Sequence, residues 1–178
     1  MIPLDYLHEC FKYDPVTGEV TWKNRPREHF LSVCSYYSFK ANVGNQVGSI
    51  DRHGHRWTIL TYNKIRYRLA AHRLALMLSG IDIPEGMEVD HINRCGSDNR
   101  LSNLRVAKHQ HNIFNCRISK NNTSGVTGVN KARNKWVASI MLSRKKIHLG
   151  TFINKEDAVT ARREAEIRLF KDFAPNRN

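Results

Sequence analysis

Two short stretches, Glu88-Val89-Asp90-His91-Ile92-Asn93 and Leu101-Ser102-Asn103-Leu104-Arg105-Val106, decide the fold of this chain. Each has the apolar content of a short strand, and a turn-rich loop from 94 to 100 joins them. A helix that contains Asn112 is expected after the second stretch. The order predicts a β-β-α unit in which polar side chains gather where the first strand ends.

The residues at that strand end suit metal-assisted hydrolysis of a phosphodiester. Asp90 offers a carboxylate oxygen and Asn112 an amide oxygen, and both suit Mg²⁺ or Mn²⁺. His91 is expected on the opposite face of the strand from Asp90, and an imidazole readily accepts a proton from water. A base on one side of a phosphate and a metal on the other is what in-line hydrolysis needs. Taken singly, each of these groups is more simply a solvated or turn residue.

Composition favours a polyanionic partner. The 178 residues include 29 Lys and Arg against 16 Asp and Glu, a net charge of +13. Residues 118–178 carry 13 basic and 5 acidic side chains and are the more electropositive part. Apolar runs are too short for a membrane span, and the first residues lack a secretory pattern, so a cytoplasmic protein with free thiols is expected.

The pattern of apolar residues predicts an α+β protein of two modules. Residues 1–80 form an N-terminal extension, 81–117 the β-β-α unit, 118–124 a polar linker, and 125–178 three strands followed by a helix. In the extension we expect helices at 3–11 and 70–78, a long loop at 24–45, and strands at 20–22, 46–50, 57–62 and 65–69. In the last module we expect strands at 126–131, 136–142 and 147–152 and a helix at 155–170, with Asn154 as its N-cap and an apolar stripe of Ala158, Ala161, Ala165 and Leu169.

The strings Asp90-His91-Ile92-Asn93 and Asp98-Asn99-Arg100-Leu101-Ser102-Asn103-Leu104-Arg105 resemble the asparagine-ending HNH endonucleases of phages and introns. The resemblance implies a ββα-metal nuclease core in which His91 is the general base and Asp90 and Asn112 are metal ligands. It makes Asn103 the residue that ties the loop and orients His91, and we expect Asn93 and Arg94 to contact substrate phosphate. One site per monomer implies nicking, by a monomer or homodimer without an obligatory protein partner.

This chain departs from the full HNH pattern at the end of the motif. The last histidine of the pattern is Asn112, and a further histidine of some members is Cys116. The loss of imidazole ligands favours loosely held Mg²⁺ over Zn²⁺, with Cys116 as a soft ligand left as an alternative.

Four further strings, Gly128-Val129, Lys135-Trp136-Val137-Ala138-Ser139-Ile140, Leu149-Gly150-Thr151-Phe152 and Glu156-Asp157-Ala158, resemble the plant ethylene-response-factor type of DNA-binding domain. That resemblance implies a sheet in the major groove of double-stranded DNA. The candidate DNA-binding residues are Lys120, Asn130, Lys131, Arg133, Lys135, Trp136, Arg144 and Lys146. Asn130, Ala132 and His148 replace family Arg and Trp residues, which favours phosphate binding over base reading, and Trp136 could equally be core.

The N-terminal region also resembles the leader of phage HNH proteins, in Tyr13-Asp14-Pro15-Val16-Thr17-Gly18 and in Ala71-His72-Arg73-Leu74-Ala75. We assign it no chemistry, and His72 is expected to be a packed core histidine. Two alternatives to a DNA endonuclease stay open. One is a DNA-binding regulator that retains the fold without cleavage, and the other is a nuclease of structured RNA, whose deep, narrow major groove disfavours a strand reader.

Overall fold

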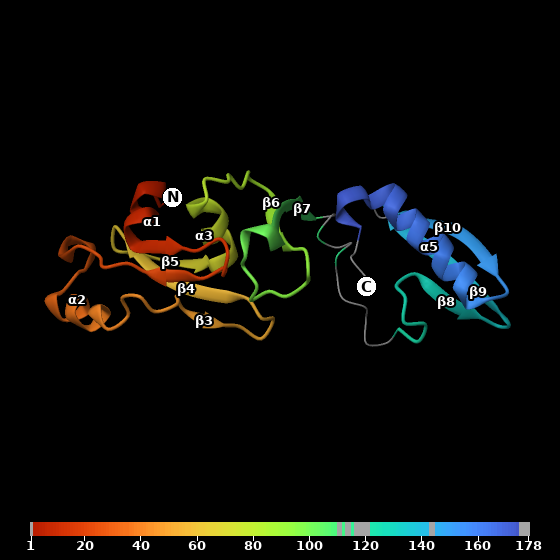
Figure 1. Ribbon diagram of the computed structural model, residues 1–178, viewed down its shortest axis with the longest axis horizontal. Coiled ribbons are helices and arrows are strands. Elements are labelled where there is room, and N and C mark those ends of the chain that lie inside the picture. Colours follow the sequence, from red (N-terminus) through yellow and green to blue (C-terminus); the bar gives the residue numbers. More distant parts are fainter. Residues whose placement is uncertain (1, 110–111, 113–114, 116–121, 143–144, 175–178) are drawn as a thin grey trace. The chain divides into compact units, whose positions relative to one another are not determined.

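The computed structural model describes residues 2–109, 112, 115, 122–142 and 145–174 (Figure 1). The chain is α+β, as predicted, with small sheets that alternate with helices. It divides into two compact units, Met1–Val106 and Ala107–Asn178. No helix in the described part of the chain is long and apolar enough to cross a membrane.

The first unit begins with a helix and a tight hairpin. Helix α1 (Leu4–Cys10) leads into strand β1 (Phe11–Tyr13), which pairs antiparallel with β2 (Val20–Trp22). The hairpin turn is closed by Asp14, whose Oδ1 accepts a bond of 2.8 Å from the Val16 amide. Gly18 has a φ of +78°, in the left-handed region that favours glycine.

The predicted long loop at 24–45 is wrong, because this segment contains the 3₁₀ turn η1 (Arg27–His29) and helix α2 (Val33–Lys40). Ser32 and Ser35 form a capping box at the start of α2. No residue of α2 is buried, so the helix has no apolar stripe that a periodicity argument could detect.

A second sheet and a short helix complete the part of the unit that supports the site. Strands β3 (Ser49–Ile50), β4 (Arg56–Tyr62) and β5 (Ile65–Ala70) pair antiparallel in that order, and α3 (Ala71–Leu78) follows directly. One core cluster joins this helix and sheet to α1 and the hairpin through the buried side chains of Leu7, Phe11, Val20, Leu60 and Leu74.

Helix α3 also packs against the predicted β-β-α segment. Strand β6 (Met87–His91) pairs with β7 (Leu104–Lys108), and the 3₁₀ turn η2 (Leu101–Asn103) precedes β7. Ala75 and Leu76 of α3 form a buried cluster with Val89 and Leu104. Because this cluster crosses the boundary predicted at residue 80, the structure places residues 1–106 in one unit and draws the division after Val106.

The second unit is a three-stranded antiparallel sheet with one helix. Strands β8 (Val129–Ala132), β9 (Lys135–Leu142) and β10 (Lys145–Phe152) lie in the order β10-β9-β8, and α5 (Lys155–Phe170) packs on one face, followed by the turn η3 (Lys171–Phe173) (Figure 1). Val129, Ala138 and Ala158 form one buried cluster, and Ile140, Ala165 and Phe170 form another. The bounds of α5 are those predicted.

The buried face of α5 differs from the predicted alanine and leucine stripe. Arg162 and Glu166 are buried on it, and the Arg162 Nε donates to Glu166 Oε1 at 2.9 Å. Arg162 also donates to the Ser139 carbonyl of β9, so the charged pair replaces apolar packing at the centre of the helix. Asn154 lies at the N-cap position, but its side chain donates to Asp157 and makes no cap bond. Residues 118–121 of the predicted linker lie outside the described residues.

Candidate functional site

Asp90 and His91 lie at the end of β6 and are 4% and 6% exposed. Val89 packs against α3, and His91, two positions further along the strand, has its ring 5.3 Å from that of His72 on the same helix. The Asp90 side chain instead contacts Arg105 of β7. The two side chains therefore leave the strand on opposite faces, as the alternation of a strand requires.

The Asp90 carboxylate is held by a guanidinium. Arg105 donates to Oδ2 of Asp90 from Nε at 2.8 Å and from Nη2 at 2.7 Å. A buried carboxylate is costly unless it is paired, so Arg105 offsets the cost of burying the Asp90 side chain. Sequence reasoning missed Arg105, although its alternation with the buried Leu104 places it on the same face as Asp90.

The His91 imidazole is held by Asn99, a second residue that sequence reasoning missed. His91 Nε2 lies 3.0 Å from the side-chain oxygen of Asn99, which is 1% exposed. Because a carbonyl oxygen only accepts, Nε2 carries the proton and Nδ1 carries the lone pair. Burial lowers the pKa of His91 below its usual value, so the ring is neutral near neutral pH.

Asn103 ties the loop between the two strands. Its Oδ1 accepts a bond of 3.0 Å from the Asn93 amide, and its Nδ2 donates to Asn93 Oδ1 at 3.0 Å and to the Asp98 carbonyl at 2.7 Å. All of these bonds lie within the loop. The side chain that contacts the imidazole is that of Asn99, which the same loop carries, so an orienting role of Asn103 toward His91 stays a prediction.

The side chain of Asn93 also serves the loop. Asn93 is exposed, but its Nδ2 donates to Asp98 Oδ2 at 2.7 Å and its Oδ1 accepts from the Cys95 amide at 2.8 Å. The Arg100 guanidinium on the Asp98 carboxylate, at 2.8 and 2.6 Å, lowers the pKa of that carboxyl to about 2. The expected phosphate contact of Asn93 stays a prediction.

Arg94 lies in the turn that follows β6. Its φ is +62°, in the left-handed region that is uncommon outside glycine, and its amide donates to the His91 carbonyl at 2.9 Å. The side chain is half-buried. Its expected contact with substrate phosphate stays a prediction.

The N-terminal hairpin supports the segment that carries Asn99. The Tyr13 hydroxyl donates to the Asn99 carbonyl at 2.8 Å, and the Leu101 amide donates to the Pro15 carbonyl at 3.2 Å. A Cβ on Gly18 would lie 2.5 Å from the Arg100 nitrogen, so only glycine fits against this part of the loop. The hairpin turn, to which the sequence assigned no chemistry, thus positions the residue that holds the His91 imidazole.

The residues expected to hold a metal are only partly described together. Asp90 is in the first unit, Asn112 belongs to the second, and Cys116 lies outside the described residues. Within the described part, no group of three or more His, Cys, Asp or Glu side chains is placed to hold a metal ion. A carboxylate and an amide oxygen fit Mg²⁺ or Mn²⁺, which take few protein oxygens and keep several waters, better than Zn²⁺.

In the second unit the predicted DNA-binding residues do not share one face. Trp136 packs in the cluster beneath α5, and Lys131 lies across from it on β8, so both belong to the helix side of the sheet. Asn130, Lys135 and Lys146 lie on the opposite, open face, because they alternate with or pair beside the buried positions. Trp136 is half-buried against this core, the alternative that the sequence left open, and its expected contact with DNA stays a prediction.

Three other members of the predicted set can be placed only in part. Arg133 is exposed in the turn between β8 and β9 with a φ of +52°. Lys120 and Arg144 lie outside the described residues.

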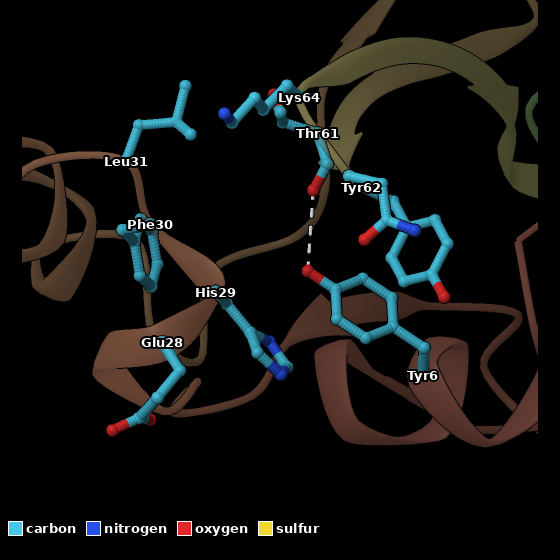
Figure 2. Close-up of a pocket in the computed structure, with 9 residues that line it drawn as sticks. Tyr6, Glu28, His29, Phe30, Leu31, Thr61, Tyr62 and Lys64 are labelled. Carbon is cyan, nitrogen blue, oxygen red and sulfur yellow. Dashed lines mark hydrogen bonds between the residues drawn. The ribbon is translucent and has the colours of Figure 1, made fainter.

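A small cavity in the first unit is separate from the β6 residues. It has a volume of about 170 Å³ and is lined by Tyr6, Glu28, His29, Phe30, Leu31, Thr61, Tyr62, Asn63 and Lys64 (Figure 2). The Tyr6 hydroxyl donates across it to the Thr61 carbonyl at 3.3 Å. The thiol of Cys10 lies 3.9 Å from His29 Nδ1, but burial raises the pKa of Cys10 to about 11 and keeps it protonated. Cys10, Cys34 and Cys95 are free, as predicted.

Comparison with known proteins identifies the segment that contains these residues. Residues 69–113 match the family model described as HNH endonuclease. This segment of the chain is similar to HNH endonucleases. The matched segment includes Asp90, His91, Asn103 and Asn112, so the resemblance expected from the sequence is confirmed for it. The resemblance of the second unit to ethylene-response-factor domains stays a prediction.

Two individual proteins are similar to parts of the chain. Protein 3.8 of Escherichia phage T7 is 35% identical over 65 residues, which cover 35% of this chain and 54% of that protein. A solved structure titled "DNA binding and cleavage by the HNH homing endonuclease I-HmuI" is 22% identical with a TM-score of 0.40, covering 58% of this chain and 49% of that one. The chain spans about half the length of each.

Proposed function

We propose that this protein is a divalent-metal-dependent DNA endonuclease that cuts one strand per active site. The observation that carries the proposal is the pair Asp90 and His91 on opposite faces of one buried strand end, each held by a dedicated partner, inside the HNH segment. A carboxylate fixed on one face and a neutral imidazole on the other can serve the two sides of a phosphodiester.

His91 acts as the general base through Nδ1. Because Asn99 holds Nε2 with its proton, the lone pair on Nδ1 is the one that accepts the proton of the attacking water. The water oxygen forms a bond to phosphorus, and the bond from phosphorus to the 3′ oxygen breaks. The products are a 5′-phosphate and a 3′-hydroxyl, whose oxygen takes its proton from solvent.

Asp90 and Asn112 would hold Mg²⁺ or Mn²⁺. When bound, such an ion supplies charge stabilisation at the phosphate and at the leaving oxygen. Asp90 is buried at the strand end, where the Arg105 guanidinium compensates its charge and fixes the position of the carboxylate.

The second unit binds duplex DNA through the open face of its sheet. Asn130, Lys135 and Lys146 lie on that face, and residues 118–178 carry 13 of the 29 basic side chains. With Trp136 packed against the core, the face offers lysine and amide contacts to phosphates, which fix register and contribute affinity without reading sequence.

Supercoiled plasmid tests the proposal. Wild-type protein should convert it to open circles with Mg²⁺ or Mn²⁺ and not with EDTA, and His91→Ala should not. His8→Ala, an exposed histidine on α1, is the matched control and should cut like the wild type. Linear product without open circles would contradict nicking. No metal-dependent product would contradict the enzyme and favour a DNA-binding regulator.

A further inference from the structure

A histidine outside the HNH segment lies against the proposed base. The ring of His55, in the turn between β3 and β4, has its centroid 5.6 Å from that of His91 and 5.5 Å from that of His72. The centroids of His72 and His91 are 5.3 Å apart. The three imidazoles therefore contact one another in pairs and form a nearly equilateral triangle, in which His91 meets a ring from α3 and a ring from the β3–β4 turn.

The turn that carries His55 is fixed by one aspartate. Asp51 Oδ1 accepts from the amides of His53 at 2.8 Å and His55 at 3.0 Å, and its Oδ2 accepts from Trp57 Nε1 at 2.9 Å. The Asp51 amide also donates to the His55 carbonyl at 2.8 Å. These bonds use the polar atoms of both ends of the turn, so the His55 backbone has a defined position relative to the sheet.

The His55 ring also lies against the loop between β6 and β7. A Cβ on Gly96 would lie 2.9 Å from His55 Cδ2 and 3.1 Å from Nε2, so the loop and the ring are in close contact. The φ of Gly96 is not in the left-handed region, which means that glycine is needed there for space and not for conformation. A residue without a side chain therefore occupies the loop position that the His55 imidazole contacts.

The third ring of the cluster, His72, is a neutral neighbour. His72 is half-buried, and burial lowers its pKa to about 3, so it is uncharged at working pH. Its Nδ1 is buried and has no hydrogen-bond partner within the described structure. A ring that makes no hydrogen bond through that nitrogen contributes to the site by its shape.

From these contacts we infer that His55 is a positioning residue for the nuclease reaction: with His72 it confines the His91 ring, so that the bond from Asn99 selects one orientation and one tautomer. The inference rests on the proposed function, in which His91 is the base. A base must hold its lone pair within a few tenths of an ångström of the productive position, and contact with two neighbouring rings restricts the rotation that one hydrogen bond alone would allow.

The test compares His55→Ala with His55→Phe in the full chain. The first removes the ring, and we expect kcat for plasmid nicking to fall about 10- to 100-fold while KM for DNA changes less than twofold. The second keeps an aromatic ring without its nitrogens and should recover most of the lost kcat. His53→Ala removes an exposed imidazole two positions away and is the matched control.

Nitrogen NMR of the His91 ring gives a readout that does not need activity. The wild type and His55→Phe should show one tautomer protonated at Nε2, and His55→Ala should show averaged ring signals. If the wild type fails to nick, the proposed function fails, yet these spectra still decide the positioning role.

Three results would overturn the inference: a wild-type kcat in His55→Ala, a raised KM with unchanged kcat, or a His55→Phe variant as slow as His55→Ala. If His55→Ala does not fold, Gly96→Ala replaces it, because its Cβ would lie 2.9 Å from the His55 ring and 3.2 Å from the Gly54 carbonyl carbon and so displaces the ring from the loop. That variant should lose kcat to the same degree, and a normal kcat in it would equally overturn the inference.

Discussion

Replacement of Asn103 by alanine tests how the loop between β6 and β7 holds its form. The side chain is 7% exposed and makes three hydrogen bonds, to the Asn93 amide, Asn93 Oδ1 and the Asp98 carbonyl. Each such bond contributes about 1 kcal/mol net, and the exposed Asn93 side chain can regain water in part. We therefore expect Asn103→Ala to lower the free energy of opening the loop by about 2 to 3 kcal/mol.

Amide hydrogen exchange measures this opening directly. The Asn93 amide donates to Asn103 Oδ1, so its exchange should become about 30- to 150-fold faster in Asn103→Ala, at about 1.4 kcal/mol per tenfold. Ser102→Ala changes the exposed neighbour and should leave exchange as in the wild type. Plasmid nicking should fall with loop order, because the same loop carries Asn99.

One result would refute the reasoning. If the Asn93 amide of Asn103→Ala exchanges within twofold of the wild-type rate, the loop does not depend on this side chain, and Asp98 with Arg100 must hold it instead. A loss of nicking with normal exchange would instead give Asn103 a direct part in the reaction.

Three further predictions concern charge. The pKa of His72 is about 3 in the folded chain and near 6.5 in the unfolded chain. As the pH falls from 6.5 toward 3, protonation of the unfolded chain therefore lowers the free energy of unfolding by about 1.4 kcal/mol per pH unit. His72→Phe should flatten the pH dependence of urea unfolding in this range. Arg105→Gln removes the guanidinium from buried Asp90 and should cost about 3 kcal/mol of stability in the same assay, with Arg105→Lys recovering part of it. Lys135→Ala and Lys146→Ala should each lower the slope of log Kd for duplex DNA against log salt by about 0.9, and an unchanged slope would remove the open face from the binding surface.

The elements with regular apolar patterns could be predicted from the sequence. Helix α5 runs from Lys155 to Phe170 as expected, because acidic residues in its first turn and small residues along one side mark it. Helix α2 could not be predicted, since none of its residues is buried and its packing comes from aromatic rings around Arg25. Periodicity reports burial, and a helix without burial leaves no such pattern.

In the candidate site, too, some residues could be predicted from the sequence and others could not. Asp90 and His91 are adjacent in the chain, so strand alternation alone places them on two faces. Asn99 looks like a turn residue, and only the path of the loop brings its oxygen to His91. His55 is still further away in sequence, and its place depends on how a separate sheet packs, which no local spacing encodes.

The hairpin turn that contacts the loop also limits how this domain can be transplanted. A cassette of residues 69–113 grafted onto another DNA-binding protein would contain Asp90, His91 and Asn99 but would lack Tyr13, Pro15 and Gly18, which lie against the loop backbone. Asn99 would then be carried by a segment with one side open to water. The smallest transplantable unit that keeps the proposed site therefore begins at α1, and a fusion partner belongs after Asn112 and not before β5.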